Sequence, residues 1–459
     1  MPQLISREST FSRRGFLHSA AAISAPFFIP SRVLGFTDEK PPSDKINIAG
    51  IGLGGQGKVD LSNLESENIV ALCDVDEAHA GGTLGRYPNA TRYTDYRKML
   101  DEQKDIDAVV IATPDHTHAC IAMAAMQLGK HVYCEKPLTH SVWEARELAQ
   151  AAREQKVATQ MGNQGQASEE TRRLCEMVWD DAIGPVREVH AWTDRPSNGL
   201  FNEYWPQGID RPKDTPAVPP TLEWDLWLGP APDRPYHPAY LPFRWRGWWD
   251  FGTGALGDIG CHSLDPVFRA LKLGQPESVD ASSTRVNTET YPLSSMVTYH
   301  FPARGEMPPL KLVWYDGGLR PPRPEELDPG RQMGTNGHLL IGDKGKILSR
   351  RGQGRSGFRL LPESRDKEYG DPPRKLERSI GHFNEWIEAC KGGPAAGSNF
   401  DWAGPLTEAV LLGNVALRPE MREEMTTKRL LWDGPNLRFT NSDTANKFIK
   451  REYRANWAV

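Results

Sequence analysis

A glycine-rich turn directly after a short apolar run constrains the fold of this chain more than any other feature. Residues 48–57 read IAGIGLGGQG. Two registers of the pattern G-x-G-x-x-G fit this turn: Gly50/Gly52/Gly55 and Gly52/Gly54/Gly57. We prefer the second register because it leaves residues 45–51 long enough for a buried strand. Glycines permit the tight strand-to-helix turn and let the backbone approach a dinucleotide pyrophosphate without a Cβ atom in the way.

The residues around this turn alternate between strand-like and helix-like patterns. Short apolar runs predict strands at residues 45–51, 69–75, 108–113 and 131–134. Helical stretches follow at residues 119–128 and 142–155. Alternation of short buried strands with helices is typical of an α/β Rossmann domain with a doubly wound parallel sheet. We place this domain at residues 45–165.

An acidic residue at the end of the second predicted strand supports a nucleotide site. Asp74 lies close to the distance from the glycines at which an acidic side chain accepts hydrogen bonds from the adenosine ribose hydroxyls. Its charge would repel the additional phosphate of NADP, so NAD is the favoured cofactor. Asp76 is the competing candidate for this role. An ordinary strand-to-helix turn without a nucleotide is the simpler interpretation, which the order of strand, loop, strand and Asp disfavours.

The second half of the chain has a different pattern. Partial alternation predicts longer strands at residues 186–194, 278–287, 296–301 and 310–315. These favour an α+β domain with a large open, mostly antiparallel sheet over residues 166–425, followed by a segment at 426–459. The intervening sequence, residues 196–242, is rich in Pro, Trp and Tyr, and we interpret it as a long ordered loop.

The first residues resemble an export signal. Arg13 and Arg14 precede Phe16-Leu17 and a short apolar stretch, the order of a twin-arginine signal. We therefore expect a signal peptide at residues 1–35, a linker at 36–44, and a periplasmic or extracytoplasmic location. Ala25 and Gly35 each end a plausible cleavage site, and a basic arm without signal function is the alternative.

Composition excludes several other classes of protein. The 459 residues carry 55 Lys and Arg against 60 Asp and Glu, a net charge of −5 that disfavours nucleic acid and anionic membranes as partners. No apolar run is long enough to predict a membrane-spanning helix in the mature protein. The six cysteines form no C-x-x-C pair, and several lie in apolar runs, which predicts buried thiols. His116 and His118 lack an evident third ligand, so we predict no metal site.

Three further motifs carry a resemblance to a known family. Residues 113–118 read TPDHTH, residues 134–137 read CEKP, and residues 254–265 read GALGDIGCHSLD. Together with the glycine turn, they resemble the Gfo/Idh/MocA oxidoreductases, which include glucose–fructose oxidoreductase and inositol dehydrogenase. The resemblance covers about residues 45–417. Asp115 stands where the family usually has Asn, which puts that contact in doubt.

The resemblance implies a role for each matching residue. Lys136 would lie beside the nicotinamide and stabilise the reacting hydroxyl oxygen. His262 would be the general base, and Asp258 would bind a neighbouring hydroxyl or orient the histidine. Residues 258 and 262 share one helix face. The simpler alternatives are a solvated loop lysine and an aspartate that caps its helix. The cofactor contacts would come from Gly52, Gly54, Gly57, Asp74, Thr113, Pro114, His118, Glu135, Lys136 and Asn163.

The substrate side is predicted from aromatic and polar residues that precede the last motif. Aromatic rings with polar neighbours suit the apolar faces and hydroxyl rim of a sugar or cyclic polyol. We select Trp192, Arg244 and Trp249 as substrate-binding residues, with packing of the loop as the alternative for each tryptophan.

The predicted activity is hydride transfer between a sugar or polyol hydroxyl and NAD. Because an exported enzyme finds little free NAD outside the cytoplasm, its location would favour a cofactor that stays tightly bound and is recycled. One alternative is a glycosidase or lyase of the same fold that uses NAD transiently, although the known glycosidase branch carries a Gly-His-Gly-rich segment where this chain has GDIGCH. The other is a non-catalytic sugar-binding protein. By analogy with the family, we expect a homodimer or homotetramer.

Overall fold

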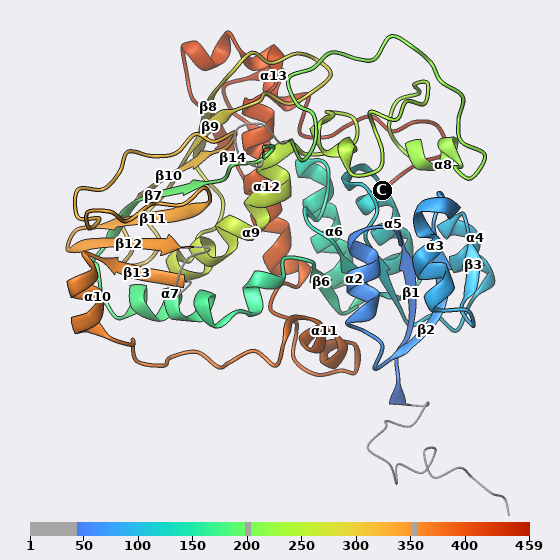
Figure 1. The fold of residues 1–459 in the computed structure, drawn as a ribbon, viewed down its shortest axis with the longest axis horizontal. Helices are drawn as coiled ribbons and strands as arrows, with labels where there is room; N and C mark the ends of the chain where they lie inside the picture. The colour runs from blue at the N-terminus through green and yellow to red at the C-terminus, as the bar shows by residue number, and fades with distance from the viewer. Residues whose placement is uncertain (1–43, 198–202, 351–356) are drawn as a thin grey trace, which may run out of the picture. The chain divides into compact units, whose positions relative to one another are not determined.

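The computed structural model describes residues 44–197, 203–350 and 357–459. Residues 46–459 form one compact unit that contains two β-sheets. Figure 1 shows the first sheet and its helices in blue and teal and the second sheet in green, yellow, orange and red. The predicted signal peptide and most of the linker lie outside the described residues.

Six parallel strands form the first sheet, in the order β3-β2-β1-β4-β5-β6. The strands are β1 (Asn47–Ile51), β2 (Asn68–Cys73), β3 (Thr91–Tyr93), β4 (Ala108–Ile111), β5 (His131–Cys134) and β6 (Thr159–Met161). The helices between them are α2 (Gln56–Ser62), α3 (Glu77–Arg86), α4 (Tyr96–Glu102), α5 (Asp115–Gln127) and α6 (Val142–Gln155). The predicted doubly wound parallel sheet is confirmed.

Both faces of this sheet are buried. In β1, Ile48 belongs to one apolar cluster with residues of α2 and α3, whereas Ala49 and Ile51 belong to another with residues of α4, α5 and α6. Neighbouring residues of a strand point to opposite faces, so an uninterrupted apolar strand requires cover on both sides. The short apolar runs in the sequence therefore reflect a sheet enclosed by helices.

The second sheet has nine strands in the order β13-β12-β11-β7-β10-β9-β8-β14-β15. Only β7 and β10 pair in parallel, which confirms an open, mostly antiparallel sheet. In chain order, its first four strands are β7 (Val186–Trp192), β8 (Ser278–Ser283), β9 (Ser295–Phe301) and β10 (Leu310–Tyr315). The others are β11 (Gly337–Gly342), β12 (Gly345–Arg350), β13 (Gly357–Leu361), β14 (Leu430–Asp433) and β15 (Arg438–Phe439).

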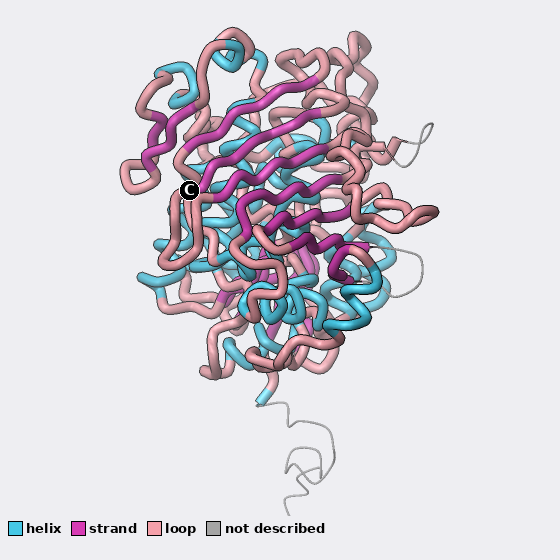
Figure 2. The backbone as a smooth tube through the Cα atoms, turned by 90° about the vertical axis from the view of Figure 1, so that its left-hand side faces the viewer, coloured by secondary structure: helices cyan, strands magenta, loops and turns pink. Residues whose placement is uncertain are grey.

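Helices cover one face of the second sheet. The helix α9 (Gly254–Leu271) packs on both α7 (Glu169–Trp179) and α12 (Phe400–Ala416), and α12 also packs on α6. Figure 1 shows α9 and α12 between the two sheets. Figure 2 shows the opposite face of the sheet without helices over its central strands. The remaining helices are α8 (Trp224–Leu228), α10 (Glu363–Tyr369), α11 (His382–Cys390) and α13 (Asp443–Asn446).

Two late segments return to the first sheet. The helix α11 packs on β5, where the Tyr133 ring stacks on Phe383 with centroids 5.4 Å apart and meets the edge of Trp386 at 5.6 Å. Residues 447–459 run past α6, where the Trp143 amide donates to the Ile449 carbonyl at 2.9 Å. Packing therefore crosses the boundaries drawn from the sequence at residues 165 and 425.

Cysteine burial agrees with the prediction from the sequence. All six cysteines are free thiols, and every one except the half-buried Cys390 is buried. Within residues 44–197, 203–350 and 357–459, no helix combines the length and apolarity that crossing a membrane requires.

Candidate active site

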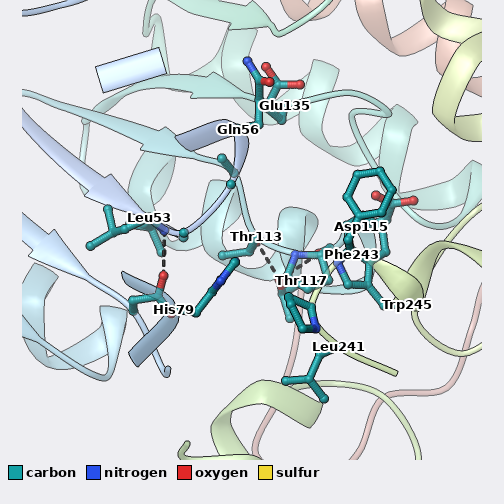
Figure 3. Close-up of a pocket in the computed structure, with 18 of the residues that line it drawn as sticks. Leu53, Gln56, His79, Thr113, Asp115, Thr117, Glu135, Leu241, Phe243 and Trp245 are labelled. Atoms are coloured by element: carbon teal, nitrogen blue, oxygen red, sulfur yellow. Dashed lines mark hydrogen bonds between the residues drawn. The ribbon is translucent and has the colours of Figure 1, made fainter. Parts of the chain in front are cut away.

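A cavity of about 620 Å³ lies at the carboxyl ends of the first sheet's strands. One side is formed by the glycine turn and the segments after β2, β4 and β5, the other by residues 204–246 and α9. Figure 3 shows that side chains from both sides surround this space, from Leu53 and His79 to Phe243 and Trp245. Ligands of open α/β sheets bind outside the carboxyl ends of the strands, at the point where the strand order reverses.

The glycine turn has the geometry of the register Gly52/Gly54/Gly57. Gly52 has φ +83°, and a Cβ atom there would lie 2.7 Å from the Ala112 backbone. A Cβ atom on Gly57 would lie 1.9 Å from the Gly52 carbonyl oxygen, so α2 packs directly on the turn. A Cβ atom on Gly55 would meet nothing within 4 Å. The turn thus requires glycine at 52 and 57 but not at 55.

Asp74 connects the glycine turn to the end of β2. Its Oδ2 accepts a hydrogen bond from the Leu53 amide at 2.6 Å, and its Oδ1 accepts one from the Asp76 amide at 2.9 Å (Figure 3 draws the bond at Leu53). Burial raises the pKa of Asp74. Each carboxylate oxygen has a second lone pair, and Asp74 lines the cavity. Asp76 also lines it, but its carboxylate caps α3 by accepting from the His79 amide at 3.1 Å.

Lys136 and Asp258 form a shielded ion pair in the cavity. Lys136 Nζ lies 2.7 Å from Asp258 Oδ1. Only 13% of the lysine side chain and 11% of the aspartate side chain are exposed. Nζ also donates to the Asp258 carbonyl at 2.8 Å, and Arg246 Nε donates to Asp258 Oδ1 at 2.9 Å. Burial raises the pKa of Asp258, but the charges of Lys136 and Arg246 outweigh it and hold this pKa below its ordinary value. Lys136 is therefore not a solvated loop lysine.

His262 lies one helical turn beyond Asp258 on α9. It is half-buried and lines the same cavity, so the two side chains share the helix face predicted from their spacing. Asp258 does not cap this helix, because the N-cap residue is Thr253 and the Asp258 carboxylate is engaged by two cations. The structure therefore brings Lys136, Asp258 and His262 together.

The segment after β4 joins the first sheet to α9. Thr113 and Pro114 line the cavity, and Thr117 Oγ1 donates to Thr113 Oγ1 at 2.8 Å. Asp115 Oδ2 accepts from the Thr253 hydroxyl at 2.6 Å, at the start of α9. Burial raises the pKa of Asp115 to about 7. In this chain, Asp115 thus makes a buried polar contact between the two halves of the molecule.

Glu135 is part of a buried acidic cluster beside the ion pair. Its Oε1 accepts from Gln164 Nε2 at 3.0 Å, and its Oε2 accepts from the Lys136 amide at 3.3 Å. Burial raises the pKa of Glu135 to about 7. Burial, together with the charge of Glu135, raises the pKa of the fully buried Asp60 to about 9. Two carboxyl groups in one apolar environment do not readily carry two charges.

Three of the predicted cofactor residues, Gly57, His118 and Asn163, lie outside the cavity lining. His118 is buried in α5, with Nδ1 2.9 Å from the Pro137 carbonyl oxygen and Nε2 2.9 Å from the Thr113 carbonyl oxygen. It thereby links the loops that carry Thr113 and Lys136. Asn163 is fully buried after β6, and in the described part of the chain neither polar atom of its side chain has a hydrogen-bond partner. Neither side chain lines the cavity.

The three predicted substrate residues also lie outside the cavity lining. Trp192 is 1% exposed, and its ring fills the space above Gly337 in the second sheet. The Trp249 ring packs against the Tyr291 ring with centroids 3.6 Å apart and an angle of 36° between the ring planes. Arg244 is exposed, whereas Arg246 reaches Asp258, because residues two apart in the short 3-10 helix Arg244–Gly247 point in different directions. The predicted role of these three residues in substrate binding therefore has no support from the cavity lining.

Three of the aromatic residues that line the cavity surround Arg246. Its guanidinium carbon lies 4.0 Å from the Phe243 ring centre, 4.2 Å from that of Trp245 and 5.9 Å from that of Trp205. Phe243 is 45% exposed and has φ +67°, an uncommon angle for a non-glycine residue. The density of Trp and Arg at residues 243–249 indicated the region, but it did not distinguish its members.

No metal centre is evident in the residues that the structure covers. They contain no group of three or more His, Cys, Asp or Glu side chains arranged to hold an ion. His116 is buried with its ring nitrogens 3.2 Å and 3.0 Å from the carbonyl oxygens of Phe251 and Trp227. Burial lowers the pKa of His116 to about 3. Both histidines of the H-x-H pair therefore make structural contacts.

The shape of the glycine turn fits a dinucleotide. Gly52 closely approaches Ala112 and Gly57 closely approaches Gly52, so the backbone of the turn lies next to the amino end of α2, and the His79 ring lies against Gly54. Amide groups at a helix start attract phosphate. With an acidic side chain at the end of β2 and a charged pair farther along the cavity, this arrangement defines a dinucleotide-binding oxidoreductase fold.

Comparison with known proteins identifies the family. Residues 45–163 match the NAD-binding Rossmann-fold model of the Gfo/Idh/MocA oxidoreductase family, and residues 199–302 match the model of its C-terminal alpha/beta domain. The chain belongs to the Gfo/Idh/MocA oxidoreductases, as the sequence motifs indicated.

Individual relatives differ in what they do. An inositol 2-dehydrogenase from Salmonella typhimurium is 30% identical over 150 residues, which cover 32% of this chain and 44% of that protein. A glycosyl hydrolase family 109 protein from Bacteroides fragilis is 40% identical over 259 residues, 54% of this chain and 47% of that protein. The chain thus spans less than half the length of these curated relatives.

Solved structures share the fold at low sequence identity. An aldose-aldose oxidoreductase from Caulobacter crescentus, complexed with glycerol, aligns with TM-score 0.54 and 17% identity over 84% of this chain and all of the other. The WlbA dehydrogenase from Bordetella pertussis, complexed with NADH and UDP-GlcNAcA, aligns with TM-score 0.56 and 16% identity over 85% and 99% of the two chains. These similarities show the fold alone.

Proposed function

We propose that this protein is an NAD-dependent oxidoreductase that transfers a hydride between the carbon of a sugar or cyclic polyol hydroxyl and the nicotinamide ring. One observation carries the proposal. The Lys136–Asp258 pair and His262 line the same cavity as the glycine turn. Charged groups that can stabilise an oxyanion and move a proton thus share one enclosed space with a nucleotide-binding surface.

Each residue of this group has a distinct task. Lys136 donates a hydrogen bond to the reacting hydroxyl and lowers its pKa through its positive charge. His262 accepts the hydroxyl proton during oxidation and returns it during reduction. Asp258, held ionised by Lys136 and Arg246, fixes the position of the lysine and can accept a hydrogen bond from a neighbouring hydroxyl. Bound NAD supplies the hydride acceptor.

The aromatic residues around Arg246 support a carbohydrate substrate. Phe243, Trp245 and Trp205 line the cavity on the α9 side, away from the glycine turn. Flat apolar rings pack on the C–H face of a pyranose or inositol ring, while Arg246 and Asp258 offer partners for its hydroxyls. This is the role that the sequence analysis gave to Trp192, Arg244 and Trp249.

A second candidate function is glycoside cleavage that uses NAD transiently. The 40% identity to the family 109 glycosyl hydrolase over 259 residues favours it. Oxidation of one hydroxyl would acidify the adjacent C–H, so that a base could remove this proton and the leaving group could depart with a proton as the alcohol. Water would then add to the resulting double bond, and return of the hydride would reduce the ketone to the original hydroxyl. The same Lys136 and His262 would serve the oxidation step, and no net NADH would form.

One experiment separates the two functions. The purified protein is incubated with NAD and a panel of sugars, inositols and nitrophenyl glycosides, while absorbance reports NADH and nitrophenol. NADH formation that Lys136→Ala abolishes supports the oxidoreductase. Nitrophenol release without net NADH supports the glycosidase. If the wild type binds NAD but neither product forms with any member, the non-catalytic sugar-binding alternative replaces both proposals.

Location and assembly are separate proposals. Arg13-Arg14 and the following apolar stretch support export by the twin-arginine route, which Arg13→Lys/Arg14→Lys should block. The face of the second sheet without helices supports self-association (Figure 2). Light scattering of the purified protein should give a dimer or tetramer, whereas a monomer mass would contradict this proposal.

A further inference from the structure

Residues 447–459 are fastened across the first half of the molecule. Arg451 Nε donates to Glu144 Oε1 at 2.7 Å, where Glu144 is fully buried in α6, and the guanidinium also donates to the His116 carbonyl. The Tyr453 hydroxyl donates to the same Glu144 oxygen at 2.7 Å. Ion pairs with a buried partner are costly to break from one side. This first anchor therefore holds the segment firmly on α6.

A second anchor lies three residues farther along. The Arg454 guanidinium donates to Asp225 Oδ1 at 2.6 Å, to Asp233 Oδ1 at 2.8 Å and to the Gly229 carbonyl at 3.0 Å. The Arg454 amide donates to the Pro230 carbonyl at 3.1 Å. These contacts join the segment to α8 and the loop after it. The chain between residues 451 and 454 is thus fixed at both ends.

Trp457 follows this anchor and lines the cavity. Its amide donates to the Arg454 carbonyl at 3.1 Å, which turns the chain inward. Its ring centre lies 4.7 Å from the Arg97 guanidinium carbon and 6.3 Å from the Tyr96 ring centre, and Tyr96 lines the cavity as well. Two aromatic rings that are far apart in the sequence, those of Tyr96 and Trp457, therefore meet at one wall.

This wall lies at the end of the cavity remote from the Lys136–Asp258 pair. Tyr96 follows β3, and β3 lies beyond β2 on the side of the sheet away from β5, which carries Lys136 at its end. In a doubly wound fold, the pyrophosphate lies at the glycine turn, and the acidic residue after β2 contacts the adenosine ribose. The base attached to that ribose extends toward the segment after β3. Tyr96 and Trp457 thus border the space for adenine.

We propose that Trp457 and Tyr96 form the adenine-binding wall of the dinucleotide site, and that the segment anchored by Arg451 and Arg454 retains the cofactor. The inference rests on the proposed binding of NAD and adds a residue that the glycine, acid and lysine motifs do not contain. Planar bases stack on aromatic side chains, and Arg97 on the Trp457 ring fixes the orientation of that ring. A nucleotide held in this way leaves slowly, as a recycled cofactor must.

The test compares Trp457→Ala with Trp402→Ala. Trp402 is a matched control, since it is also half-buried beneath an arginine, with Arg269 4.2 Å from its ring centre, but it lies outside the cavity lining. NADH is bound and chased with excess NAD in a stopped-flow instrument, and its fluorescence gives the dissociation rate. Loss of one stacking partner should raise the rate about 10- to 100-fold for Trp457→Ala and leave Trp402→Ala at the wild-type rate.

The two halves of the dinucleotide, AMP and nicotinamide mononucleotide, and a second variant make the test specific to adenine binding. For Trp457→Ala, the Kd of AMP should rise by the same factor, whereas the Kd of nicotinamide mononucleotide should not change. Arg454→Met keeps the tryptophan and should also speed NADH release, because it removes the anchor. Wild-type rates and wild-type AMP affinity in both folded variants would overturn the inference. Failure of the wild type to bind NAD or AMP would instead overturn the proposed function.

Discussion

The two sides of the cavity are built in different ways. On the nucleotide side, the wall residues from Gly52 to Glu135 lie at the ends of parallel strands, in the turns after them, or in the first two turns of the helices that follow. On the substrate side, the walls come from α9 and from residues 204–246, which contain only short helices. The first side is positioned by backbone pairing, and the second by side-chain contacts such as Arg246 with Asp258.

This difference determines how each side responds to substitution. Backbone-built walls tolerate changes of side chain but not of backbone geometry, so a single added Cβ atom matters at Gly52. Side-chain-built walls depend on individual charges, so a neutral replacement matters at Lys136 or Arg246. Substitutions on each side of the cavity, most of them paired with a matched control variant, provide the tests.

Lys136→Ala should have the largest effect on turnover. It removes the charge that stabilises the oxyanion, and kcat on the substrate found by the panel should fall about 1,000-fold. The Kd of NAD should change little, since the glycine turn is untouched. Lys104→Ala, at a lysine side chain that is 70% exposed, is the control and should retain full activity. A loss of NAD binding that matches the loss of activity would place Lys136 on the nucleotide side.

Gly52→Ala should weaken NAD binding about 100-fold or more, because a Cβ atom at φ +83° would lie 2.7 Å from the Ala112 backbone. Gly55→Ala is the matched variant, since its Cβ atom would enter open space. Titration of NADH fluorescence should give a near wild-type Kd for Gly55→Ala. Equal weakening in both would favour the register Gly50/Gly52/Gly55 and contradict the geometry described above.

Arg246→Leu should lower kcat/KM about 30-fold, since Asp258 loses one of its two cationic partners. Arg244→Leu alters an exposed side chain two residues away and should change kcat/KM less than twofold. Steady-state kinetics with both variants measure the contrast directly. A larger effect at Arg244 would restore the original selection and would mean that the loop rearranges when substrate binds.

Asp115→Asn should have the smallest effect, and it concerns stability. Burial raises the pKa of Asp115 from 3.8 to about 7, so below pH 7 the folded protein keeps a proton that the unfolded chain has lost. The free energy of unfolding of the wild type therefore falls as the pH rises between these values. Relative to the wild type, the variant should gain about 1.4 kcal/mol between about pH 6 and 8. Urea denaturation at both pH values measures this gain, and parallel curves would contradict it.

The sequence predicts the nucleotide side well for a physical reason. Strands buried on both faces are continuous apolar runs, and their ends carry the glycines and acids that the turn requires, so residues 108–113 and 131–134 are found within two residues of β4 and β5. The strand β3 escapes prediction because two of its three residues are exposed. The helix α5 begins four residues earlier than expected, because the motif at residues 113–118 itself enters the helix.

The substrate side resists prediction because its contacts are remote in sequence. The strands β11, β12 and β13 follow a long loop and were not predicted, and Trp192 is buried by the β11 residue Gly337. Trp457 reaches the cavity only because Arg451 and Arg454 find partners more than 200 positions away. No local pattern encodes such pairings. The motif of Asp258 and His262 is the exception, since one helix carries both.

A crystal structure of the protein with NAD tests the central claim most directly. The claim is that one cavity holds the nucleotide along the glycine turn and presents its reactive ring to Lys136 and His262. We expect the pyrophosphate at residues 52–57 and the adenine against Trp457 and Tyr96. We expect the nicotinamide C4 to face Lys136 and His262, so that a substrate carbon about 3.5 Å from C4 can place its hydroxyl within hydrogen-bond distance of both side chains. A nicotinamide pointing away from Lys136, or electron density for the nucleotide elsewhere, would contradict the account.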